Sequence, residues 1–167
     1  SLERIAAHYL PYTASYTRAE LIRDIQALNT LSSPVISPGQ TLTIPVIRSE
    51  PLKAQRKAKK KDFSARGIYV NQRNAGSRDV FNLAGKMRQV GVNTVVFDVK
   101  EVHGALAYPS TIPGSYASIT SYPSNIEEIA KLVDYLHKMD VHVIARICIF
   151  RDKLMAAAME DWRYNNE

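Results

Sequence analysis

Two kinds of hydrophobic pattern follow one another along the chain. In residues 1–9 and 18–28 the apolar side chains recur about every three to four positions, which predicts two short helices. Thr17 and Glu20 have the spacing of a capping box at the start of the second helix. Pro38 and Gly39 then predict a turn, and "TLTIPV" at 41–46 alternates as a strand does. The first region is therefore expected to be a helix–helix–strand unit.

From residue 65 onward, strand and helix patterns alternate. Apolar runs at 65–71, 93–99 and 141–150 predict three strands, and helical spacing near 80–90 and 126–137 predicts a helix in each interval. This alternation is typical of a parallel sheet with right-handed crossovers, buried on both faces. The class is therefore α/β. Open doubly wound sheets and closed eight-stranded barrels share the pattern, and in both the functional groups gather at the carboxyl ends of the strands.

A basic segment separates the two regions. The stretch "RSEPLKAQRKAKKKD", residues 48–62, holds seven cations and two carboxylates, so it carries +5 of the net charge of +6. It has no apolar periodicity, and repulsion between like charges extends such a segment, which favours a solvated linker. Attraction to an acidic polymer, such as a teichoic acid, nucleic acid or an anionic membrane, is the alternative. We accordingly divide the chain into an N-terminal module (residues 1–47), a basic linker (48–64) and a C-terminal domain (65–167).

The composition and motifs of the chain exclude several kinds of functional site. The chain is 46% hydrophobic and can bury a core, but no apolar run reaches the roughly 18 residues of a membrane-spanning helix. Cys148 is the single cysteine, which excludes an internal disulfide, and the histidines show no metal-ligand spacing. The stretch "GIYVNQRNAGSRD" lacks the glycine pattern of a nucleotide-binding loop. We therefore expect no metal, no cofactor and no membrane span.

Three stretches of the N-terminal module carry a family resemblance. "SLERIAAHY", "LIRDIQALN" and "ISPGQTLTIP" together resemble the body of a LysM module, a family whose pattern is a strand, two helices and a returning strand. The opening strand of that pattern falls before Ser1. The resemblance therefore implies a small α+β module that lacks its first strand.

The LysM resemblance also implies a ligand. The family binds glycans that contain N-acetylglucosamine, such as peptidoglycan or chitin, in a groove between the turn that enters the first helix and the loop that enters the last strand. By position, the implied glycan-binding residues are Ser1, Leu2, Leu31 and Ile36. The alternative is that the three apolar residues among them only close a very small core.

Ionisable side chains cluster where the second predicted strand of the C-terminal domain ends. Asp98 and Lys100 have the side-chain parity of Val96, and Arg146 has the parity of Ile144 in the third strand. If these strands are neighbours, Asp98 and Arg146 can meet, since pairing is the least costly way to keep both ionised when buried. Such a pair either seals the fold or orients a substrate hydroxyl and holds a catalytic carboxylate ionised. Asp98, Lys100 and Arg146 are our candidate catalytic residues.

The connection after the second strand is unusually long. Residues 101–123 exceed the roughly two to six residues of an ordinary strand-to-helix loop, which favours a binding loop. The loop carries Tyr108, Tyr116 and Tyr122, whose rings offer a sugar an apolar plane and a polar edge. Packing of these rings on the rim of the fold is an equally good account.

The C-terminal domain also carries a resemblance. "ARGIYVN", "VNTVVFDVKEVHGALAYPS" and "VHVIARICIFRDKLMA" resemble the opening strands of a glycoside hydrolase-like family with a β/α barrel. The resemblance places Asp98, Lys100, Arg146 and Asp152 at motif positions of that family. Within these motifs, the candidate substrate-binding residues are Tyr69, Asn71, Glu101, Tyr108 and Asp152.

The length of the C-terminal domain limits this resemblance. An eight-stranded barrel needs around 250 residues, whereas residues 65–167 supply 103. We therefore expect a partial (β/α)8 TIM barrel, its first three strands, in a fragment of a longer protein. Glycosidases with this barrel usually carry their acid pair on the fourth strand or later, so the main acid pair is expected beyond Glu167.

Together these predictions indicate a carbohydrate-active protein of the cell envelope or the extracellular space. A glycan-binding module would be joined to a glycoside hydrolase-like barrel that acts on a polysaccharide, and this fragment alone is expected to be inactive. One alternative is a non-catalytic cell-wall-binding or structural protein with a barrel scaffold; a weaker one is a basic module for nucleic acid or another polyanion. An incomplete barrel exposes sheet edges, which favours self-association.

Overall fold

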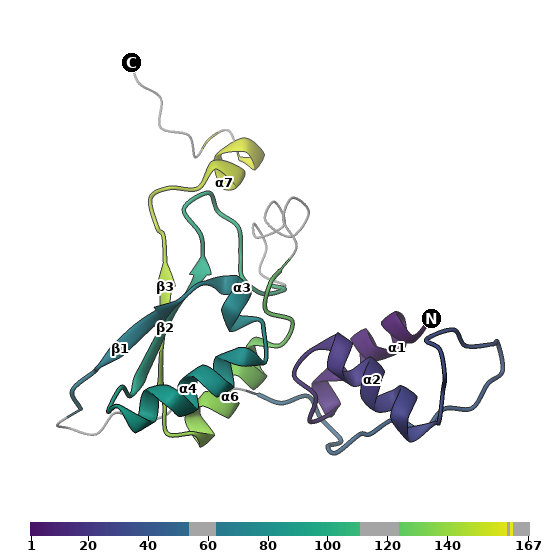
Figure 1. Cartoon of the computed structure of the whole chain (residues 1–167). Helices are drawn as coiled ribbons and strands as arrows, with labels where there is room; N and C mark the ends of the chain where they lie inside the picture. The colour runs from purple at the N-terminus through teal and green to yellow at the C-terminus, as the bar shows by residue number, and fades with distance from the viewer. Residues whose placement is uncertain (54–62, 111–123, 160, 162–167) are drawn as a thin grey trace.

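The N-terminal module is built on two helices. The computed structural model describes residues 1–53, 63–110, 124–159 and 161 (Figure 1). The chain begins with α1 (Leu2–Tyr9), the 3-10 helix η1 (Leu10–Tyr12) and α2 (Arg18–Leu28). The hydroxyl of Thr17 accepts a hydrogen bond of 3.2 Å from the backbone of Glu20, which confirms the predicted cap of α2. The small core of the module consists of Leu2, Ala6, Leu10, Leu21 and Ile25.

The predicted strand at 41–46 does not form. Within the described residues, this segment makes a single antiparallel bridge, between Thr13 and Val46. A strand needs a partner along its length to satisfy its backbone groups. The side chain of Asn29 replaces part of that ladder, because its amide donates to the carbonyl of Thr43 at 2.8 Å and its oxygen accepts from the amide of Thr43 at 2.7 Å. The segment is therefore extended and held by one side chain.

The C-terminal domain has the predicted parallel sheet. Strands β1 (Gly67–Val70), β2 (Thr94–Lys100) and β3 (His142–Ile147) lie in the order β1-β2-β3, and both pairings are parallel. Short α3 (Gln72–Ala75) and α4 (Asp79–Gln89) connect β1 to β2. Helix α6 (Ile129–Lys138) precedes β3, and α7 (Lys153–Ala158) follows it. No helix among the described residues is long and apolar enough to cross a membrane.

The two faces of the sheet differ. One face packs on α4 and α6 through alternating apolar residues such as Val70, Val95 and Phe97. The other face carries Tyr69 and Arg146, whose exposed fractions are 51% and 56%. The expectation that both faces are buried is therefore wrong for the described residues, because the helices lie on one side (Figure 1).

The N-terminal module packs directly on the C-terminal domain. The contact is made by residues 10–20, which we call the docking segment. Tyr16 is buried among residues of the C-terminal core, and its ring meets Phe81 edge-on with centroids 4.9 Å apart. Its hydroxyl donates a hydrogen bond of 2.6 Å to the carbonyl of Ala75. An aromatic residue of one module thus completes the core of the other.

A buried lysine reinforces the same contact. Lys131 on α6 is buried, and its ammonium donates to the carbonyls of Leu10 and Ser15 at 2.5 Å each. Tyr135, one turn along the same helix face, donates to the carbonyl of Ala14 at 2.8 Å. These donors bind the carbonyls of Ala14 and Ser15, and they add a hydrogen bond to the carbonyl of Leu10, which also accepts from the amide of Thr13.

Two ion pairs flank the buried part of the contact. Arg18 lies 2.7 Å from Glu127, and Arg78 lies 3.1 Å from Glu20. Both arginines are largely exposed, so each pair contributes at most about 1 kcal/mol. The buried contact of Tyr16 is therefore expected to stabilise the interface more than either ion pair does.

Candidate functional site

Asp98 is the centre of a hydrogen-bonded cluster at the carboxyl end of β2. Parallel pairing places it opposite Arg146 of β3, as the side-chain parity predicted. Its Oδ1 accepts from Nε of Arg146, and its Oδ2 accepts from the second nitrogen of that guanidinium and from the hydroxyl of Tyr69, each at 2.8 Å. The Arg146 guanidinium also lies over the Tyr69 ring, 5.1 Å from its centroid.

The hydrogen bonds to Asp98 raise the pKa values of both of its partners, Tyr69 and Arg146. Asp98 is 1% exposed, although both its partners lie largely in solvent. The hydrogen bond to Asp98 raises the pKa of the Tyr69 hydroxyl, so this group remains a donor. The same contact raises the pKa of Arg146. The carboxylate of Asp98 accepts three hydrogen bonds, which fix its orientation toward Tyr69 and Arg146.

A second ion pair lies one step farther along the strands. The pairing of β2 and β3 shifts between Asp98 and Lys100, so that Lys100 lies opposite Ile147. Such bulges re-aim side chains at strand ends. The Lys100 ammonium donates to the carbonyl of Cys148 at 2.6 Å and lies 3.0 Å from the carboxylate of Asp152. The four motif positions therefore form two ion pairs, Asp98 with Arg146 and Lys100 with Asp152.

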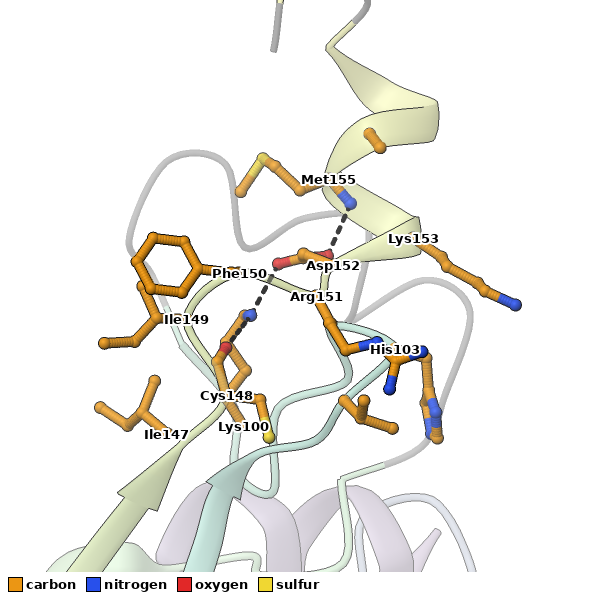
Figure 2. Close-up of a pocket in the computed structure, with 12 residues that line it drawn as sticks. Lys100, His103, Ile147, Cys148, Ile149, Phe150, Arg151, Asp152, Lys153 and Met155 are labelled. Carbon is orange, nitrogen blue, oxygen red and sulfur yellow. Dashed lines mark hydrogen bonds and ion pairs between the residues drawn. The ribbon is translucent and has the colours of Figure 1, made fainter. Parts of the chain in front are cut away.

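Asp152 also ties two loops together. Its Oδ1 accepts from the amide of Met155 at 2.8 Å and so caps α7. Gly104 lies so close that a Cβ built on it would be 1.9 Å from that oxygen, and its φ of +102° favours glycine. Leu154 in turn donates to the carbonyl of His103. The loop after β2 and the loop after β3 thus form one unit beyond the strand ends (Figure 2).

Comparisons with known proteins identify both parts of the chain. Residues 67–167, more than half of the chain, match the family described as "Putative glycosyl hydrolase domain". The chain belongs to this glycosyl hydrolase-like family. Residues 1–45 match the LysM domain. Both resemblances expected from the sequence are confirmed.

One solved structure shares the fold. The chain is similar to a hypothetical protein from Ruminiclostridium thermocellum, with a TM-score of 0.50 and 23% sequence identity. The similarity covers 56% of this chain and 49% of that one, so the chain spans about half the length of the protein it matches. No curated protein matches the sequence.

The other candidate residues of the glycosyl hydrolase-like domain have varied surroundings. The side chain of Asn71 accepts from the amide of Asn74 at 2.9 Å and caps α3. Tyr108 packs against the core, the alternative considered for the loop tyrosines. Glu101 begins the loop, where its amide donates to the carbonyl of Ala105. Residues 111–123, with Tyr116 and Tyr122, lie outside the described residues, as do 54–62 of the basic linker.

The candidate glycan-binding residues of the LysM domain lie around its small core. Leu2 is 2% exposed and belongs to that core, and Leu31 and Ile36 pack against it. Ser1 is exposed at the start of α1. Leu2 is thus a core residue, whereas Leu31 and Ile36 are half-buried at the edge of the core.

Metal-binding groups do not gather in the described part of the chain. No set of three or more His, Cys, Asp or Glu side chains there is placed to hold a metal ion. The cluster around Asp98 instead combines a carboxylate, a guanidinium and a phenol, groups that bind hydroxyls and charges by hydrogen bonding.

Replacement of Gly104 by alanine tests the link between the loops. We expect Gly104→Ala to displace Asp152, break its ion pair with Lys100 and uncap α7, because the new methyl group would occupy the carboxylate position. The matched control is Gly39→Ala, where φ is also positive, +81°, but no atom lies within 4 Å. The loss of stability should be about 1–3 kcal/mol larger for Gly104→Ala, as judged by urea unfolding. An unchanged Met155 amide signal in NMR spectra of this variant would contradict the contact.

Proposed function

We propose that this chain is part of a carbohydrate-active protein of the cell envelope or extracellular space that hydrolyses a glycosidic bond in a polysaccharide. LysM domains bind glycans such as peptidoglycan or chitin, and the larger domain belongs to a glycosyl hydrolase-like family. In this proposal the LysM domain holds the glycan and the C-terminal domain contributes part of the reaction site.

The observation that carries the proposal is the cluster around Asp98. It lies at the carboxyl end of β2, the edge at which α/β enzymes bind their substrates. Its partners Tyr69 and Arg146 are on the face of the sheet that helices leave open. A buried carboxylate with two exposed partners is suited to orienting a sugar hydroxyl. Within the proposal, Asp98, Lys100 and Arg146 are the catalytic-site residues of this chain.

The arrangement of the sheet supports a barrel. The strands follow one another in sequence order, and α4 and α6 cover the same face. A doubly wound sheet places helices on both faces and reverses its strand order, whereas a (β/α)8 barrel keeps one winding direction and all its helices outside. We therefore infer that β1 to β3 are the first strands of such a barrel, and that Tyr69, Asp98 and Arg146 point into its interior.

The ion pairs of Asp98 and Asp152 affect whether these residues can be the two carboxyl groups that hydrolysis requires. Hydrolysis by two carboxyl groups requires them about 5–10 Å apart, one of them able to donate a proton. Asp98 and Asp152 are each engaged by a cation. We infer that they organise the site, and that the acid and its partner come from strands beyond Glu167.

Turnover by the longer protein tests this proposal. The product of the complete coding sequence is expected to release reducing ends from peptidoglycan or chitin, whereas residues 1–167 alone should bind the glycan without cleaving it. Asp98→Asn should lower kcat of the longer protein by about tenfold or more, since a charge-assisted hydrogen bond contributes about 1.5–3 kcal/mol.

Two results would overturn the proposal in different ways. Glycan binding without turnover by the complete protein would support the non-catalytic cell-wall-binding alternative. Turnover by residues 1–167 alone, lost in Asp98→Asn, would place the acid pair within this chain and refute the assignment of the later strands.

A further inference from the structure

A cavity of about 1020 Å³ lies beyond the carboxyl ends of β2 and β3. Its lining residues lie at and just beyond the ends of the two strands. They are Lys100, Val102 and His103 from β2 and its following loop, and residues 147–153, Met155 and Ala156 from β3 and its following segment. These are the loops that Asp152 ties together (Figure 2). The ion pair of Asp152 with Lys100 and its cap on α7 therefore hold the two walls of the cavity together.

The charge of this wall is positive. The described residues that line the cavity include Lys100, Arg151 and Lys153 and one carboxylate, Asp152, so the permanent charges of these lining residues sum to +2. Asp152 already faces Lys100 at 3.0 Å. Figure 2 shows Arg151 turned toward His103, while Lys153 points outward from the strand ends. Among the described residues no carboxylate pairs with Arg151, and its side chain is exposed, so its charge can meet an anion that enters the cavity.

Apolar side chains line the rest of the wall. Phe150 and Ile149 are 97% and 72% exposed, next to Arg151 in sequence and in the same wall. Exposed apolar surface rimmed by charges is typical of a binding site. A sugar ring that bears an acidic group presents both features, since its C–H face is apolar and its acid is charged.

We propose that this cavity binds an acidic sugar residue of a glycan, with Arg151 pairing with the acid and Phe150 covering the ring. The inference rests on the proposed function and narrows its substrate class to anionic glycans. A guanidinium offers two parallel hydrogen bonds to a carboxylate or a phosphate, so both acids fit the chemistry.

Titrations followed by NMR test the inference. Isotope-labelled residues 1–167 are titrated with trigalacturonate, glucose 6-phosphate and the neutral trisaccharide maltotriose. We expect one or both acidic sugars to shift the amide signals of His103, Leu154 and Met155, and maltotriose to leave them unchanged. A response to trigalacturonate alone identifies the acid as a carboxylate, and a response to glucose 6-phosphate alone identifies it as a phosphate.

Two matched variants locate the binding. Arg151→Gln should weaken the binding of the acidic sugar by about tenfold or more, because the variant loses a charge-assisted hydrogen-bonded pair. Lys86→Gln removes the same charge from an exposed position of α4 and should leave the affinity unchanged. Both side chains are exposed, so the dispersed amide spectrum should survive in each variant.

Three results would overturn the inference. They are equal shifts with maltotriose, equal weakening by the two variants, and no shift of these amides with any of the three sugars. Failure here is distinct from failure of the proposed function, because the same sample can be titrated with N-acetylglucosamine trimer. Shifts in residues 31–36 of the LysM domain would then keep glycan binding while the acidic site is rejected.

Discussion

Replacement of Tyr16 by alanine is expected to lower the free energy of unfolding of the C-terminal domain by about 3–5 kcal/mol. Tyr16 belongs to the LysM half of the chain, yet its side chain is buried in the core of the other domain and packs on Phe81. The substitution leaves a cavity there and removes the donor to the Ala75 carbonyl. Urea unfolding, combined with amide hydrogen exchange of β2, measures the effect.

Two further variants separate the causes. Tyr16→Phe keeps the ring and should cost about 1–2 kcal/mol, the cost of leaving one buried carbonyl without its donor. Ile25→Ala opens a comparable cavity in the core of the LysM domain and should reduce protection of α2 before that of β2. If Tyr16→Ala leaves the exchange of β2 unchanged, the two domains do not share a core in solution.

Local patterns predicted most of the elements. The three strands of the C-terminal domain and the four predicted helices lie close to the predicted ranges, because each is encoded by the periodicity of its own apolar residues. The short helices η1, α3 and α7 have no such pattern and were not predicted. The Asp98–Arg146 contact was also predictable. Once two parallel strands are neighbours, side-chain parity determines which residues share a face.

Features that depend on distant residues were not predictable in this way. The ion pair of Lys100 with Asp152 depends on a register shift in β2 and on a loop after β3, and neither has a periodic signal. The strand predicted at 41–46 needed a partner that the described residues do not supply, so a single asparagine holds the segment. The contact of Tyr16 and Lys131 joins parts of the chain that lie on opposite sides of the basic linker, and no local pattern predicts it.

One feature of the sequence relates to the contact between the LysM domain and the C-terminal domain. Lys131 and Tyr135 are spaced one turn apart, on a helix whose other residues include the buried Leu132 and Leu136. A lysine near the apolar side of a helix is usually a solvated cation whose stem lies along the surface. The burial of Lys131 depends on the carbonyls of Leu10 and Ser15, which are distant in the sequence, so the helix pattern alone does not predict it.

The buried lysine predicts an unusual dependence of stability on pH. Burial lowers the pKa of Lys131 from 10.5 to about 8, so the folded protein releases this proton before the unfolded chain does. Between these values the unfolded state binds more protons, and stability therefore rises with pH. The full shift corresponds to about 3 kcal/mol at most. Glu128, Arg48 and Glu20 are the charged groups that act on Lys131.

Unfolding measured from pH 7.5 to pH 9.5, with Lys131→Met as reference, isolates this effect. The stability of the wild-type protein relative to Lys131→Met should increase across this range, because the variant lacks the titrating amine but keeps the other ionisable groups. Above pH 10 the stability of each protein falls, because burial raises the pKa of Tyr16 and only the unfolded state loses that proton. Both proteins contain Tyr16, so this contribution cancels in the difference between them. The pKa of Glu128 is raised from 4.5, so its charge changes mainly at lower pH. A constant or falling difference between pH 8 and 9.5 would mean that the ammonium of Lys131 is solvated and that the LysM domain is not docked through it.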